Sequence, residues 1–213
     1  YPRGGLDERS CPEYGHALLA RTGVTALCTV RPSSKAPSKL TVRETVELGT
    51  NTVADLTVVT TFHGAHAEHL RALLAEMSVD QITKNKRAVY SKEFPLIETR
   101  KPIEINGRGN HIRTTESYTI HNPWKKTDTF RVNFEIDCAR TIARTLYMPE
   151  AERRMPVGIL SHPLHIHHTT TVWLPERSRI KDEQEFIAGP ADELKFRQIN
   201  EGHTIALEFE YRT

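Results

Sequence analysis

The stretch LTVRETVELGTNTVADLTVVTTF, residues 40–62, decides the fold. Apolar and polar side chains alternate along it on both sides of Gly49. A period of two residues is typical of a β-strand with one buried and one solvated face. The break at Gly49–Thr52 predicts a turn, so we expect two antiparallel strands, at 40–48 and 54–62.

The period changes directly after these strands. Leu70, Leu73, Leu74 and Met77 stand at i, i+3, i+4 and i+7, which places four apolar side chains on one stripe of a helix that begins near Gly64. Ser78 followed by Gln81 is a capping pattern and predicts a second helix that ends before Pro95.

Alternation then returns and continues to the C-terminus. The run Asn106–Gly109 predicts a hairpin turn between strands at 103–105 and 112–120, because Asn-Gly favours positive φ. Short strands separated by prolines are typical of a β-sandwich, and we expect one over 125–213, with strands at 129–136, 155–160, 164–174, 185–187, 193–199 and 204–211.

The predicted fold class is therefore α+β and mainly β: antiparallel strands with one or two helices, followed by a β-sandwich. Residues 1–38 have no sustained period and include turn and linker chemistry, which predicts a connector. Residues 39–124 form the predicted strand-helix-strand unit, and residues 125–213 form the predicted sandwich.

Composition excludes some classes of function. The 213 residues carry 29 Lys and Arg against 27 Asp and Glu, so the chain lacks the cationic surplus of an ordinary nucleic-acid binder. No apolar run approaches the ~18 residues of a membrane-spanning helix. The chain begins with Tyr1 and shows no targeting segment, so we expect a fragment or a processed form.

The three cysteines are Cys11, Cys28 and Cys138, an odd number without CxxC spacing. This pattern disfavours a zinc ribbon and a dense disulfide framework. A single Cys11–Cys28 bridge and three free thiols both remain open. A catalytic Cys11 is disfavoured because Pro12 and its neighbouring turn residues supply nothing that would lower the thiol pKa.

The segment from His162 to His168 is the strongest cluster of possible metal ligands. On a strand, His165 and His167 share one face about 6.6–7 Å apart, close enough to bind one zinc ion, with Glu208 or Glu210 of a neighbouring strand as a third ligand. The favoured alternative is a half-solvated strand, in which His165, His167, Thr169 and Thr171 face solvent while Leu164, Ile166, His168 and Val172 face inward. A second group, His63, His66 and His69 around the start of the first helix, lacks the HExxH spacing and indicates a solvated surface.

Two tryptophans are candidates for ligand binding. Exposed in a groove, Trp124 and Trp173 could stack on a sugar or pack on a peptide, as could Tyr118 and Tyr147. Anchoring the core is the favoured role for all four. A carbohydrate- or peptide-binding module and a histidine metal-binding domain thus remain alternative functions.

Several stretches occur in the order found in one known family. They are GGLDERSCPEYGHALL (4–19), GVTAL (23–27), LTVVTTFHG (56–64), AEHLR (67–71), ESYTI (116–120) before Trp124, and RRMPV (153–157) before WLP (173–175). Together they resemble the region beyond the catalytic core in bacterial transglutaminase-like proteins, which carry an N-terminal domain of unknown function ahead of a papain-like core. Cys11 and Glu13 depart from that pattern, where an apolar residue and Asp are usual.

The resemblance implies a function without catalysis. Such cores use a Cys nucleophile, a His base and an orienting Asp, and the resembling stretches begin downstream of all three. The resemblance therefore implies a non-catalytic accessory region, structural or binding, with no cofactor. It also implies a location in the periplasm or cell envelope, and a transglutaminase-like core of the same protein as partner.

Overall fold

The computed structural model describes residues 16–18, 20–29, 38–50, 52–126, 132–145, 164–190 and 192–213. Most of the predicted connector 1–38, Cys11, Tyr147 and the predicted strand at 155–160 lie outside these residues. Within the connector, β1 (His16–Ala17) and β2 (Cys28–Thr29) pair as a small antiparallel hairpin. Cys28 and Cys138 carry free thiols.

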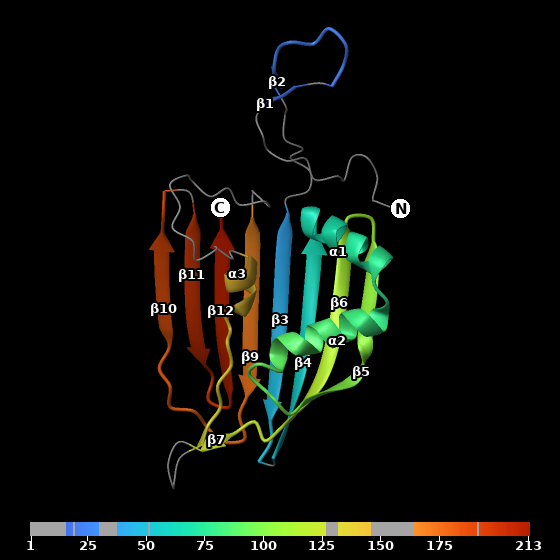
Figure 1. The fold of residues 1–213 in the computed structure, drawn as a ribbon. Helices are drawn as coiled ribbons and strands as arrows, with labels where there is room; N and C mark the ends of the chain where they lie inside the picture. Colours follow the sequence, from blue (N-terminus) through green and yellow to red (C-terminus); the bar gives the residue numbers. More distant parts are fainter. Residues whose placement is uncertain are drawn as a thin grey trace.

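One large sheet of eight strands dominates the described chain (Figure 1). Its order is β10-β11-β12-β9-β3-β4-β6-β5, and every neighbouring pair is antiparallel except β3 and β9, which are parallel. The strands are β3 (Lys39–Leu48), β4 (Val53–His63), β5 (Ile97–Arg108), β6 (His111–His121), β9 (His165–Trp173), β10 (Glu183–Ala188), β11 (Glu193–Asn200) and β12 (Thr204–Arg212). A separate short pair, β7 (Lys125–Lys126) and β8 (Val132–Asn133), is also antiparallel.

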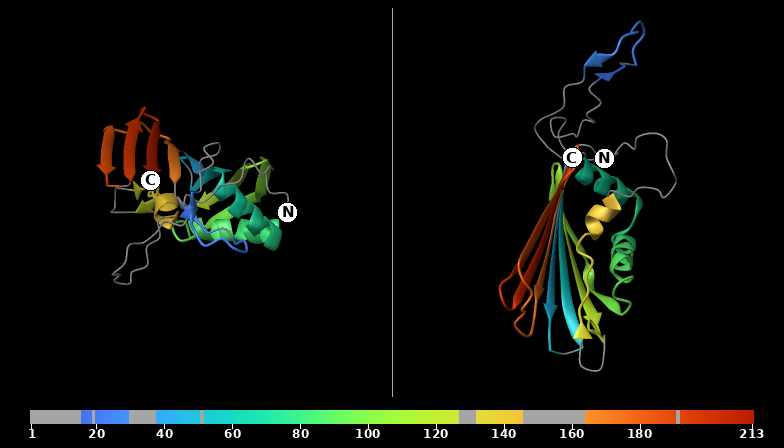
Figure 2. Two further views of the ribbon diagram at one scale, coloured as in Figure 1. Left: turned by 90° about the horizontal axis from the view of Figure 1, so that it is seen from above. Right: turned by 90° about the vertical axis from the view of Figure 1, so that its left-hand side faces the viewer.

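Alternation in the sequence determines which face each strand buries. Leu40, Val42, Val46 and Leu48 of β3 are buried, as is Glu44 on the same face, and the residues that alternate with them are exposed or half-buried. The buried face of the sheet is the one that carries the helices, as the edge-on view shows (Figure 2). No helix in the described part of the chain covers the opposite face, which is rich in Thr and charged side chains and so tolerates water.

The helices begin where capping chemistry is available. Gly64, with φ 61°, precedes α1 (Ala65–Glu76). The Ser78 hydroxyl accepts a hydrogen bond from Gln81 N at 3.2 Å and caps α2 (Val79–Tyr90), as predicted. A third, six-residue helix, α3 (Arg140–Thr145), lies on the same face of the sheet. None of the described helices is long and apolar enough to cross a membrane.

The predicted β-sandwich over 125–213 is wrong for the described strands. Strands β9–β12 extend the same sheet as β3–β6, because β9 pairs in parallel with β3 along nine residues. Of the strand predicted at 129–136, only Val132–Asn133 is a strand among the described residues. Alternation shows that one strand face is buried, but not which strand lies beside it, and this accounts for the error.

The predicted Asn-Gly turn is also displaced. Asn106 and Gly107 lie within β5, opposite Arg113 and Ile112, and the turn falls at Gly109, where φ is 58°. A Cβ atom at Gly107 would lie only 2.7 Å from the His111 carbonyl oxygen. Glycine is therefore needed there for the close approach of two backbones.

The core between sheet and helices generates a first prediction. Leu56 on β4 is fully buried, so Leu56→Ala should lower the free energy of unfolding by about 2–5 kcal/mol through lost burial and the cavity left behind. Val53→Ala on the same strand is the matched control, because Val53 is 37% exposed and its change should stay within about 0.5 kcal/mol. Urea denaturation measures both, and equal losses would contradict this assignment of the core.

Candidate functional site

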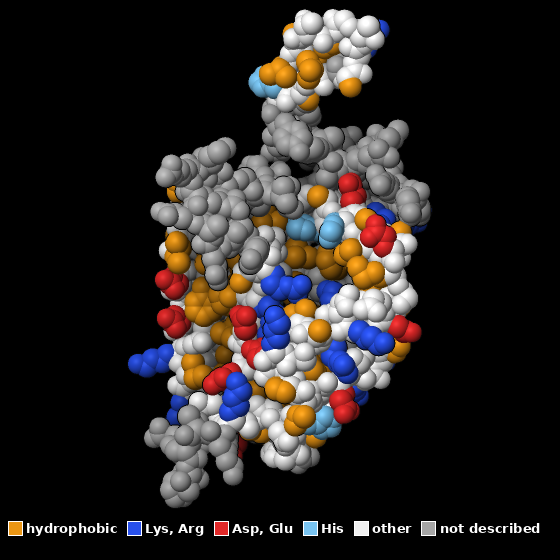
Figure 3. Space-filling model, in the orientation of Figure 1, with side chains coloured by type: hydrophobic (Ala, Val, Ile, Leu, Met, Phe, Trp, Pro, Cys, Tyr) orange, Lys and Arg blue, Asp and Glu red, His pale blue; other side chains and the backbone are white. Residues whose placement is uncertain are grey.

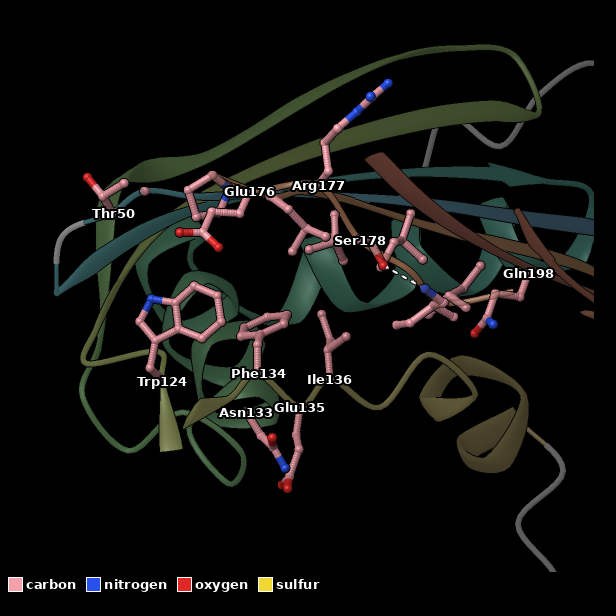
Figure 4. A pocket seen from close by; sticks show the side chains of 17 residues that line it. Thr50, Trp124, Asn133, Phe134, Glu135, Ile136, Glu176, Arg177, Ser178 and Gln198 are labelled. Carbon is pink, nitrogen blue, oxygen red and sulfur yellow. Dashed lines mark hydrogen bonds between the residues drawn. The ribbon is translucent and has the colours of Figure 1, made fainter. Parts of the chain in front are cut away.

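A groove lies beside the strands β9 and β12 on the helix-bearing face of the sheet. Hydrophobic side chains are visible on the left-hand half of that face (Figure 3), and the groove is drawn from close by in Figure 4. Its volume of about 930 Å³ is within the range of small-ligand and peptide-side-chain sites. It has an apolar floor and two walls, and its lining residues are Gly49, Thr50, Trp124, Asn133, Phe134, Glu135, Ile136, Val172, Leu174, Pro175, Glu176, Arg177, Ser178, Ile180, Gln198, Ile205 and Leu207.

The first wall consists of Trp124 and residues 133–136, held by a row of aromatic rings. Phe134 stacks on Phe94 with ring centroids 5.8 Å apart and planes 9° apart. The Trp124 ring meets Phe134 edge-on at 6.4 Å. Such pairs favour fixed ring positions. The rings of Trp124 and Phe134 therefore stand in place at the groove, as Figure 4 shows.

A cluster of polar side chains follows this wall closely along the chain. It consists of Arg140 with Glu93 and Glu44, and we call it the Arg140 anchor. Arg140, at the start of α3, forms an ion pair with Glu93, which also accepts a hydrogen bond from the Asp137 backbone N–H. The Arg140 Nη1 atom lies 3.6 Å from Glu44 Oε1, and its guanidinium lies over the Tyr90 ring at 4.5 Å. Since only residues 137–139 separate the wall from α3, the contacts of Arg140 and Asp137 fix the C-terminal end of the wall.

The Glu44 carboxylate is the buried centre of the anchor. It is 1% exposed and accepts hydrogen bonds from Tyr90 Oη at 2.7 Å and Thr170 Oγ1 at 2.8 Å, and its Oε2 lies 3.2 Å from His168 Nε2. Burial alone would raise the Glu44 pKa, but the hydrogen bond and charge of His168, with the hydroxyls of Tyr90 and Thr170, outweigh it and hold that pKa below its usual value. Glu44 is therefore a carboxylate at neutral pH.

A second buried glutamate supports the neighbouring half of the sheet. Glu116 on β6 accepts a hydrogen bond from Tyr118 Oη at 2.7 Å, and its other oxygen lies 3.2 Å from Lys86 Nζ of α2. The rings of Tyr118 and Tyr90 are 5.5 Å apart, so the two polar clusters share an aromatic boundary. Both glutamates thus tie α2 to the sheet.

The second wall of the groove consists of residues 175–178 and Ile180, in the loop between β9 and β10, and Asn200 holds it in place. Its Nδ2 donates to the carbonyl oxygens of Ile180 at 2.6 Å and Ser178 at 3.3 Å, and its Oδ1 accepts from Gly202 N at 2.9 Å. Its backbone N–H donates to Asp182 Oδ1 at 2.8 Å. One side chain at the end of β11 thereby orders the loop between β9 and β10.

The chemistry of the buried cluster suits anchoring rather than nucleophilic attack. Burial raises the pKa of the Cys138 thiol to about 12, so the thiol stays protonated at neutral pH. Glu44 and His168 are both inaccessible to a dissolved substrate. The groove, in contrast, offers apolar surface with polar groups at its rim, and this arrangement suits binding.

The structure places only one of the two candidate tryptophans, Trp124, at the groove. Trp124 is half-buried and lines the groove, whereas Trp173 is 51% exposed and follows Val172 of the groove floor, so alternation places it on the opposite face of the sheet. Tyr118 is a core residue, as the favoured interpretation predicted.

The predicted histidine pair is half-buried on the uncovered face of the sheet, with His168 on the other face in the core. His165 Nε2 lies 3.0 Å from Glu210 Oε1, and His167 Nε2 lies 2.7 Å from Glu208 Oε1, so β12 supplies the carboxylates proposed as neighbours. Burial lowers the His165 pKa despite the hydrogen bond to Glu210. No group of three or more His, Cys, Asp or Glu side chains suited to hold a metal ion occurs among the described residues.

The second histidine group is divided as well. His63 lies on the uncovered face, where its ring is 4.6 Å from that of His111 on β6, and His66 and His69 belong to α1. Burial, with the neighbouring His111 and Lys39, lowers the His63 pKa.

The sequence alone did not predict Glu44, Arg140 or Asn200 as residues that support the groove. Only Glu44 could have been found from the sequence, because it is a charged residue at a position where the alternation of β3 predicts a buried side chain.

No protein-family model matches the sequence, and no curated protein or solved structure shows significant similarity to it. A binding role must therefore be argued from the geometry of the groove.

The buried carboxylate generates a prediction about pH. Because the folded-state pKa of Glu44 is lowered, its contribution to stability is present above about pH 4.5 and is lost as the pH falls through the folded value. Glu44→Gln should cost about 3 kcal/mol at pH 7, and the loss relative to wild type should shrink towards pH 3. Glu47→Gln, an exposed change on the same strand, is the matched control. A cost for Glu44→Gln that is the same at both pH values in urea denaturation would contradict the assignment.

Proposed function

We propose that this chain is a non-catalytic accessory region that acts by binding an extended peptide in the groove beside Trp124. The groove carries the proposal: its two walls are held independently, one by stacked aromatic rings and the Arg140 anchor, the other by Asn200. A preformed site loses less conformational entropy when a ligand binds than a flexible one does.

The lining favours a peptide over a sugar. Val172, Leu174, Ile205 and Leu207 supply an aliphatic floor, and Trp124 and Phe134 add aromatic surface. Aliphatic floors bury apolar side chains, whereas a sugar needs hydrogen-bond partners for each hydroxyl that loses water. A sugar ligand is therefore the second outcome to be tested.

The accessory role rests on the resemblance to bacterial transglutaminase-like proteins. Two stretches that carry it, 56–64 and 116–120, lie almost entirely in β4 and β6, which are adjacent interior strands of the sheet, where they support the fold. The proposed partner is the catalytic core of the same protein, and the proposed location is the periplasm or cell envelope. Neither nucleic acid nor any cofactor is part of the proposal, and zinc at His165 and His167 is the alternative.

Substitutions at the groove test the binding role. A random 12-residue peptide library displayed on phage is selected against the chain, and the affinity of the enriched peptide is measured by fluorescence anisotropy. Trp124→Ala and Ile180→Ser should each weaken binding at least tenfold, about 1.4 kcal/mol. Ile180 lines the groove and is 51% exposed, so its substitution is expected to spare the fold.

Trp173→Ala is the matched control, because Trp173 is as exposed as Ile180 but lies on the face of the sheet opposite the groove. Failure to enrich any peptide, or equal binding by the two groove variants and wild type, would overturn the binding role. Selective binding of oligosaccharides instead of peptides would replace the proposed ligand.

The coding sequence upstream of Tyr1 tests the accessory role separately. An Asp-Pro-Thr shortly before Gly4, preceded by a Cys and a His in a papain-like arrangement, is the expected result. An unrelated upstream sequence would contradict it.

A further inference from the structure

The two outer strands of the large sheet are protected unequally. At one edge, β5 carries Pro102 and register irregularities between Thr99 and Lys101 and between Lys101 and Glu104. Arg100 and Lys101, which are paired with Asp55 and Glu104, add charged side chains there. Bulges, proline and cations are the features by which proteins prevent further strands from pairing with an edge.

Strand β10 at the other edge has none of these features. Its six residues pair with β11 in one uninterrupted register, and they include no proline, Lys or Arg. All six are exposed, with Phe186 at 57% and Ile187 at 54%. No described strand pairs with its outer side. As far as the described strands are concerned, the outward-facing backbone N–H and C=O groups of β10 therefore remain available for strand addition.

Side chains beside this edge carry a pattern that a bound strand could match. Glu183, Glu185 and Ile187 point to the helix-bearing face, where Glu185 and Ile187 border a hollow of about 270 Å³ with Leu194, Phe196 and Phe209. On the opposite face, Lys195 Nζ lies 5.7 Å from the Phe186 ring centroid. Neither Glu183 nor Glu185 has a cationic partner among the described residues.

We propose that the outer edge of β10 binds an extended, basic polypeptide segment as an added antiparallel strand. Directly opposed side chains in such a pair lie about 4.5–5.5 Å apart, and opposite charges there stabilise the pair. The added strand would place an apolar residue opposite Ile187 and Lys or Arg opposite Glu185 and Glu183. This inference goes beyond the proposed groove function and does not rest on it.

Charge argues against a second copy of this chain as the occupant. Antiparallel self-pairing centred on Glu185 would oppose the two copies of Glu185, and pairing centred on Gln184 would oppose Glu183 and Glu185. Like charges directly opposite one another are destabilising. Pairing centred on Phe186 leaves both glutamates without a cation, whereas a basic strand complements them.

A charge swap tests the proposal. The probe is the fluorescein-labelled peptide Thr-Val-Thr-Lys-Thr-Lys-Thr, and the control peptide has both Lys replaced by Glu. The Lys peptide should bind wild type at least tenfold more tightly than the Glu peptide in anisotropy measurements at low salt. The double variant Glu183→Lys/Glu185→Lys should reverse this preference. Glu47→Lys/Glu76→Lys, which changes the net charge equally at exposed positions elsewhere, should not reverse it.

Hydrogen exchange locates the bound peptide. Amides of β10 should gain protection when the Lys peptide binds, and Trp124→Ala should leave this binding unchanged, so failure at this edge is distinguishable from failure of the groove. The proposal is overturned by the absence of Lys-peptide binding, by a preference that the charge swap does not reverse, or by protection that maps elsewhere. It is equally overturned by a peptide-free dimer in which β10 amides are already protected.

Discussion

The parallel contact between β3 and β9 joins the two halves of the sheet, and the Glu44 carboxylate lies at this junction. Glu44 belongs to β3, and its partners Thr170 and His168 belong to β9. Tyr90 brings α2 to the same carboxylate, and Arg140 brings α3. A buried charge is costly unless it is paired and hydrogen-bonded, so the strands and helices that satisfy Glu44 are constrained to one arrangement.

Helix α3 connects the buried Glu44 carboxylate to the wall of the groove, because Arg140 at its start contacts Glu44 and the wall lies just before it in the chain. Residues 133–136 form a wall of the groove without belonging to the large sheet, and the short strand β8 contributes only Asn133 to it. The wall is held at one end by the rings of Phe94 and Trp124 and at the other by Arg140. A rigid polar anchor in the core thus supports an apolar surface that stays accessible, and binding sites require this combination.

Local sequence patterns predicted the strands and helices better than their assembly. Alternation placed Leu40 through Phe62 in two strands, and Ser78 with Gln81 located the start of α2, because each signal acts within a few residues. The pairing of β3 with β9 has no such signal. Glu44 and Thr170 are 126 positions apart, and Glu44 and Tyr90 are 46 apart. For the candidate site, the residue type of Trp124 made it a candidate for ligand binding, although anchoring the core was the favoured role. Arg140 and Asn200 act through distant partners that no spacing reveals.

Hydrogen exchange in an Arg140→Met variant tests the link from the buried carboxylate to the groove most directly. Loss of the guanidinium removes the cation that joins Glu93 to Glu44, so amides of residues 134–145 should exchange at least tenfold faster than in wild type. Amides of β4 and β6 should keep their protection, because their pairing does not involve α3. Unchanged exchange in residues 134–145, or equal acceleration in β4 and β6, would contradict the account.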